Sequence, residues 1–169
     1  MSDVIIDGLQ IRNMIDVNKK GWINLQTTNC YAYALGLDVP EKEIVPGAYG
    51  TLGAMAVAND HEITNFERHY IPGIERLEMD LDFLHLKYED ADPFELVKEN
   101  EWLIAYYYCP YEPDFDFHFL RRTNEGVWTH KMGWKKGLFV SDDDNKLIIN
   151  PEKAGFDFYI FEKCLKLSK

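Results

Sequence analysis

One cysteine lies where a helix is predicted to begin, and its thiol could act as a nucleophile. Cys30 follows the sequence TTN (27–29), three residues that can each cap a helix, and Gly36 supplies a stop after the short run YAYAL. Unpaired backbone N–H groups and the positive end of the helix dipole favour a thiolate in a first helical turn. A thiolate attacks carbonyl carbons, so Cys30 is a candidate catalytic residue. The alternative is a small buried hydrophobic residue, which describes most free cysteines.

Two histidines lie on what the sequence predicts to be the two strands of one hairpin. His118 stands in the alternating run DFDFHFLRR, on the face opposite the phenylalanines, and His130 stands in VWTHKMGW after the turn RTNEG. A turn centred on Asn124 would place the two imidazoles directly opposite, and a bulged three-residue loop with left-handed Gly126 would make them diagonal neighbours. A four-residue loop would separate them. A second imidazole can orient a general base, so both are candidate catalytic residues; the alternative is a packed or surface pair.

The elements that must position these residues change in character along the chain. Residues 1–100 have the pattern of helices and loops, including predicted helices near 51–60, 62–70 and 94–100 and a strand over 74–81. Residues 101–169 form successive short apolar runs, typical of strands, and the continuous run WLIAYYYC (102–109) indicates a central strand buried on both faces. Helices followed by an antiparallel meander predict an α+β fold.

The start of the Cys30 helix, packed over the sheet face that carries His118 and His130, would assemble a nucleophile, a base and an orienting group. This arrangement resembles the papain-like cysteine peptidases of the NlpC type, and the phrases NCYAYAL, FHFLRRTNEGVWTHKMG and DDDNKLIINPEKA resemble a bacterial and phage group in that superfamily. The resemblance covers about residues 25–155. It implies N-terminal helices packed on a C-terminal antiparallel β-sheet and a Cys-His-His triad. The usual peptidase motif has Asp-Cys and then small residues, whereas this chain has Asn29 and Tyr31 beside Cys30.

Four further residues are candidates for binding the oxyanion or the substrate. Papain-like sites use a side-chain amide shortly before the nucleophile to bind the oxyanion, and Gln26 and Asn29 are the amides at hand. Tyr31 adjoins the nucleophile. Trp128, which together with Trp134 brackets His130 in the sequence, could form a wall of a substrate groove. The alternatives are a polar loop residue for Gln26 and a core or rim position for Trp128.

The triad predicts a cysteine hydrolase that cleaves an amide bond through an acyl-enzyme, with a peptide or peptidoglycan-stem amide as the substrate that the family implies. No cofactor or metal is expected, although Cys30 with the two histidines could also bind zinc. The alternative function is a non-catalytic papain-like acidic protein, such as one encoded by a phage, that engages or inhibits a host protein.

Composition sets the frame for both functions. The chain has 169 residues, which predicts a single domain over 1–169, and 18 basic against 29 acidic residues give a net charge of −11. This charge disfavours binding to nucleic acid or to an anionic membrane, and no segment is long and apolar enough to cross one. The three cysteines have no C-x-x-C pair, and residues 1–10 lack the pattern of a secretion signal. We therefore expect a cytoplasmic protein, unless phage lysis or a secretion machine delivers it.

Overall fold

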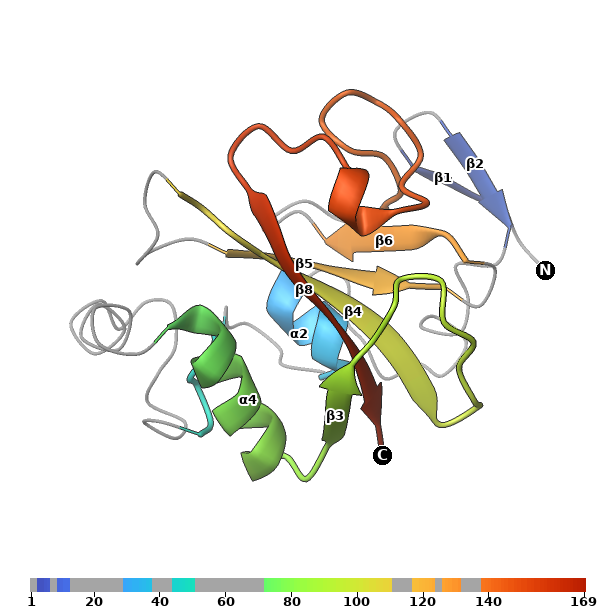
Figure 1. Cartoon of the computed structure of the whole chain (residues 1–169). Coiled ribbons are helices and arrows are strands. Elements are labelled where there is room, and N and C mark those ends of the chain that lie inside the picture. Colours follow the sequence, from blue (N-terminus) through green and yellow to red (C-terminus); the bar gives the residue numbers. More distant parts are fainter. Residues whose placement is uncertain are drawn as a thin grey trace.

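The computed structural model describes residues 3–6, 9–12, 29–37, 44–50, 72–110, 117–123, 126–131 and 138–169. The helices predicted near 51–60 and 62–70, and Gln26, lie outside these residues. The α+β prediction is confirmed, because helices accompany a six-stranded antiparallel sheet (Figure 1). Among the described residues, no helix has the length and apolar character that a membrane span requires.

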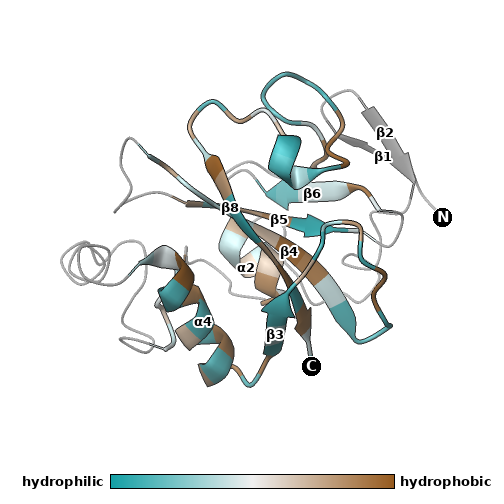
Figure 2. Cartoon of the chain, in the orientation of Figure 1, coloured by the Kyte–Doolittle hydropathy of each residue, from teal (hydrophilic) through white to brown (hydrophobic). Residues whose placement is uncertain are grey.

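The sheet has the strand order β3-β8-β4-β5-β6-β7, and its last strand in sequence lies between β3 and β4. The strands are β3 (Lys87–Asp90), β4 (Glu101–Tyr108), β5 (Phe117–Arg122), β6 (Trp128–Lys131), β7 (Leu138–Phe139) and β8 (Ile160–Ser168). A separate two-stranded sheet pairs β1 (Asp3–Ile6) with β2 (Leu9–Arg12), and the 3-10 helix η2 covers Pro151–Lys153. Figure 2 shows hydrophobic residues in the middle of β4 and hydrophilic residues along the edge strand β3.

Each face of the sheet is covered by a different part of the chain. On one face, α2 (Cys30–Leu35) and α4 (Gly73–Phe83) pack on a cluster that includes Ile104, Phe119 and Leu165. On the other face, the segment that follows β7 packs on a second cluster, which includes Leu103, Leu120, Trp128 and Cys164. Neighbouring strand residues therefore belong to opposite cores, as the two-residue period of a strand requires. Within the second cluster, burial raises the pKa of the Cys164 thiol to about 12.

The predicted caps of the Cys30 helix are confirmed. The side-chain oxygen of Asn29 accepts a hydrogen bond from the backbone N–H of Ala32, which satisfies one of the unpaired donors at the helix start. Gly36 ends the helix at φ 75°, where a residue with a Cβ would be strained. Asn29 also donates its amide N–H to the carbonyl of Ile44 at 2.6 Å, which ties the helix start to the next loop.

Two predicted elements are wrong. Residues 74–81 form most of helix α4 and not a strand, because Leu77 and Leu81 lie four residues apart and are both fully buried on one helical face. Residues 94–100 form no helix. Asp92 does accept a hydrogen bond from the N–H of Phe94, but Leu96 is 92% exposed, so a helix there would gain little from packing.

Asp80 of α4 joins the helices on this face. Its fully buried carboxylate accepts hydrogen bonds from the Tyr31 hydroxyl at 2.5 Å and from the backbone N–H groups of Gly47, Tyr49 and Gly50 at 2.8, 2.9 and 2.6 Å. These donors satisfy both oxygens, so a charge that would otherwise be costly to bury is stabilised. One side chain thus fixes α2 and the turn at 46–50 against α4.

The substitution Asp80→Asn should lower the free energy of unfolding by about 2–4 kcal/mol, because the new amide N–H would face donors and leave buried groups unsatisfied. Urea unfolding followed by circular dichroism measures the change. Asp82→Asn is the matched control, because this substitution makes the same chemical change at an exposed position of the same helix. Equal stability of the two variants would show that the Asp80 contacts contribute little.

Candidate functional site

The histidine pair is the candidate site that the structure assembles. Nε2 of His118 lies 3.0 Å from Nδ1 of His130, within hydrogen-bond distance, and the two rings are nearly perpendicular. Arg122 pairs with Trp128, and Gly126 in the loop has φ 85°, as a bulged three-residue loop requires. This register places His130 opposite Leu120 and diagonal to His118. Of the two arrangements left open by the sequence, the diagonal one is confirmed.

The hydrogen bonds assign the tautomer of each imidazole. Nε2 of His130 lies 2.9 Å from the carbonyl oxygen of Ser141, which can only accept, so this nitrogen carries a proton. In the neutral ring, Nδ1 of His130 then accepts from Nε2–H of His118. His118 is left with its lone pair on Nδ1. A lone pair held in this way is what a general base needs.

Aromatic side chains enclose the pair. Tyr159 stacks on His118 at 5.2 Å between ring centroids, and Phe156 makes a T-shaped contact with each imidazole at 5.5 Å between centroids. His118 is 5% exposed and His130 is 2% exposed. Burial, and then the neighbouring ring of His130, hold the pKa of His118 well below its usual value. His118 is therefore placed as a neutral group in an apolar environment.

The segment that covers the pair was not predicted from the sequence. Asp142 holds this segment in place. One oxygen of its carboxylate accepts hydrogen bonds from the backbone N–H groups of Asp144 and Lys146, and the other accepts one from Gly155, at 2.8–3.0 Å. Burial alone would raise the pKa of Asp142, but these backbone hydrogen bonds outweigh it and lower the pKa. The run DDDN, with a glycine thirteen residues after its first aspartate, is the signal in the sequence, because aspartate readily bonds to nearby backbone amides.

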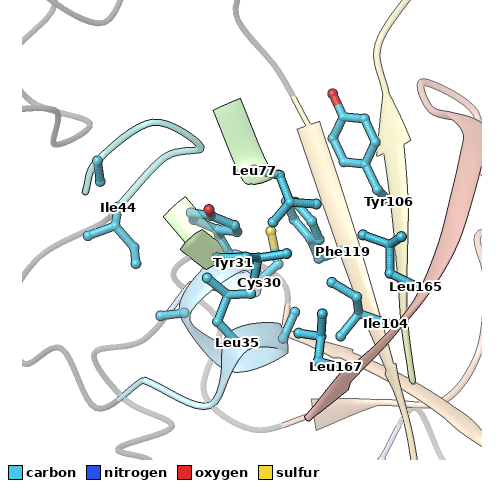
Figure 3. Close-up of a cluster of buried hydrophobic side chains, with 14 residues drawn as sticks. Cys30, Tyr31, Leu35, Ile44, Leu77, Ile104, Tyr106, Phe119, Leu165 and Leu167 are labelled. Atoms are coloured by element: carbon cyan, nitrogen blue, oxygen red, sulfur yellow. The ribbon is translucent and has the colours of Figure 1, made fainter. Parts of the chain in front are cut away.

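Cys30 does not face the histidines, and the prediction that the three residues form one cluster is wrong. Cys30 belongs to the buried cluster on the α2 side of the sheet, with Phe119 and Tyr106 (Figure 3). His118 is the strand neighbour of Phe119 and points to the other side, where it contacts Tyr159. The β5 backbone therefore lies between the thiol and the imidazole. For the same reason, Cys30 and the two histidines do not form a zinc site.

The helix lies on this face because its own surface is apolar. All six residues of α2 are buried, so the helix needs an extended apolar partner. The β5 side with Phe117 and Phe119 offers one, and Tyr31 contacts both rings at 6.1 and 4.9 Å between centroids. The opposite side carries the polar imidazoles. Packing thus takes Cys30 to the phenylalanine face.

The other predicted contact residues lie in structural positions. Both polar groups of the Asn29 side chain are used in backbone hydrogen bonds, so the side chain is not free to bind an oxyanion. Tyr31 and Trp128 are each 0% exposed, so a ligand could not touch them in this structure. Burial and the carboxylate of Asp80 raise the pKa of Tyr31 well above its usual value. In this structure, Asn29 is thus a helix cap, and Tyr31 and Trp128 are core residues.

Two wider observations complete the description of the site. Within the part of the chain that the structure describes, no group of three or more His, Cys, Asp or Glu side chains could hold a metal ion. Searches against protein-family models, curated proteins and solved structures found no match.

The buried pair should make stability depend on pH. Because the folded-state pKa of His118 lies below the unfolded value of about 6.5, the unfolded chain binds more protons below that pH. The free energy of unfolding should fall as the pH drops below about 6.5, by up to about 1.4 kcal/mol per pH unit for this group. Urea unfolding between pH 5 and pH 8 measures the slope, and His118→Phe should make it shallower.

The control for this experiment is His85→Asn. His85 is exposed at the end of α4 with φ 58°, a conformation that asparagine tolerates, so the control removes one imidazole and leaves the pair intact. An unchanged slope in His118→Phe would show that protonation of His118 is not linked to unfolding.

Proposed function

We propose that this protein, with a papain-like arrangement of the NlpC type, binds a partner and does not hydrolyse an amide through Cys30. The arrangement is supported by helix α2, which begins at Cys30 and packs on strands β5 and β6 of an antiparallel sheet. The observation that carries the proposal is the position of Cys30 and His118 on opposite faces of that sheet.

This separation opposes the proton transfer that a thiol enzyme needs. A general base must approach the nucleophile to hydrogen-bond distance, about 3 Å, or reach it through one water molecule. Here the backbone of β5 lies between the thiol of Cys30 and the imidazole of His118. Cys30 is only 7% exposed, and the two histidines are more deeply buried. A carbonyl substrate would have to touch both groups at once.

The charge of the chain suggests the chemistry of the partner. The 29 acidic residues outnumber the 18 basic residues, and the resulting field attracts basic surfaces and repels phosphate backbones. Complementary charge raises the rate of encounter and discriminates against acidic partners. A protein with a basic surface is therefore the partner that fits best.

Hydrolysis by the Cys-His-His triad is the competing function, and the hydrogen bond between His118 and His130 favours it. In that mechanism, Nδ1 of His118 takes the thiol proton and the thiolate attacks the amide carbon. The imidazolium then returns the proton to the leaving amine, and water hydrolyses the acyl-enzyme. For these steps, the start of α2 would have to lie on the histidine side of β5.

A thiol-directed probe separates the two functions. At pH 7, we expect an electrophilic activity-based probe to label the folded wild type no faster than it labels Cys30→Ala, because the thiol is buried and His118 lies on the opposite face of the sheet. Intact-mass spectrometry gives the labelling rates. The urea-unfolded chain, with all three cysteines open to the probe, is the positive control. Rapid labelling that needs both Cys30 and His118 would overturn the binding proposal and establish the hydrolase.

A further inference from the structure

Helix α4 presents an outward face on which carboxylates and apolar side chains form two adjacent rows. Glu75 and Asp82 are exposed and Glu78 is half-buried, while Met79 is 40% exposed and Phe83 is 57% exposed. At 3.6 residues per turn, these five residues cover an arc of about 140°, with the three carboxylates along one edge. We call these five residues the α4 face.

Both edges of the α4 face continue onto neighbouring elements. On the apolar edge, the ring of Tyr49 stacks with Phe83 at 6.1 Å between centroids, and Gly50 lies so close to Met79 that a side chain there would collide with the Met79 backbone. On the acidic edge lies Tyr88 of β3, whose pKa is raised by burial and then by the nearby carboxylates of Asp82 and Glu78. The face is thus part of a wider surface with one apolar and one acidic side.

The carboxylates of the α4 face are not neutralised by basic side chains of the described part of the chain. Helix α4 has no lysine, and its single arginine, Arg76, is buried and donates to the carbonyl of Pro46. Among the described residues, Glu75, Glu78 and Asp82 form no ion pair, whereas Glu89 and Glu95 are both paired with Lys166. Within the described residues, nothing therefore cancels the negative charge of the α4 face.

We propose that the α4 face docks a basic amphipathic segment of a partner protein, an inference that rests on the binding function proposed above. Lysine or arginine side chains on one edge of the segment would face Glu75, Glu78 and Asp82, and its apolar edge would cover Met79 and Phe83. A second copy of this chain is a poor occupant. Its net charge of −11 repels a like copy, and a symmetric contact would oppose identical carboxylates.

A synthetic peptide tests the proposal on the full chain. The probe is a fluorescein-labelled peptide of about 18 residues, with leucine at helical spacing and lysine elsewhere. Fluorescence anisotropy should show binding to the wild type at about 50 mM NaCl that weakens strongly at about 500 mM. The triple variant Glu75→Gln, Glu78→Gln, Asp82→Asn should bind about tenfold more weakly.

A matched control keeps the net charge equal. The variant Glu99→Gln, Glu152→Gln, Glu162→Gln removes three exposed carboxylates from other parts of the surface and should bind within about twofold of the wild type. For the apolar row, Met79→Ser with Phe83→Ser should weaken binding about fivefold. Its control is Leu96→Ser with Phe158→Ser, because these side chains are 92% and 62% exposed elsewhere.

Hydrogen exchange of the wild type gives a readout that does not depend on the folding of any variant. Bound peptide should slow amide exchange over Gly73–Phe83 more than over β6. Equal losses of affinity in the two triple variants, or no protection of α4, would overturn the docking surface. Those outcomes leave the binding function to be decided by the thiol probe, whose result depends on Cys30 and not on α4.

Discussion

The alternation of side chains along β5 is the constraint on which the rest of the structure depends. His118 and Phe119 are adjacent in sequence, so they must point to opposite faces of the sheet. Phe119 joins the core under α2, and His118 joins the aromatic cluster under the segment after β7. The choice of face for the helix therefore decides at once which side chains can meet. With α2 on the phenylalanine face, the thiol of Cys30 and the imidazoles belong to separate interiors.

Two aspartates hold the covers of these interiors in the same physical way. On the helix side, Asp80 accepts hydrogen bonds from a tyrosine hydroxyl and three backbone N–H groups. On the histidine side, Asp142 accepts hydrogen bonds from three backbone N–H groups. A carboxylate that accepts several amide hydrogens replaces much of its lost hydration and orders the loop that supplies them. Irregular segments, which have few regular hydrogen bonds of their own, are thereby held in one conformation over the two cores.

Local features of this structure could be predicted from the sequence, and long-range ones could not. The caps at Asn29 and Gly36 depend on a few neighbouring residues, so their signals are short and strong. The bulged loop at Gly126 was one of several loop types that the same short stretch allowed. The α4 segment was predicted as a strand because its apolar spacing fits more than one period until the burial of Leu77 and Leu81 is known. The side of the sheet on which α2 packs depends on the total apolar area of each face, which no single segment contains.

The environment of the histidine pair argues for a structural role. Burial keeps the imidazole of His118 neutral, and the hydrogen bonds of the pair, including the one to the carbonyl of Ser141, use three of its four ring nitrogens. A general base works best when its pKa lies near the working pH, yet the same burial holds the pKa of His118 well below that range. The contacts that make the pair a good core element thus make His118 a weak base. A surface function, such as docking on α4, requires nothing from these imidazoles beyond a rigid sheet.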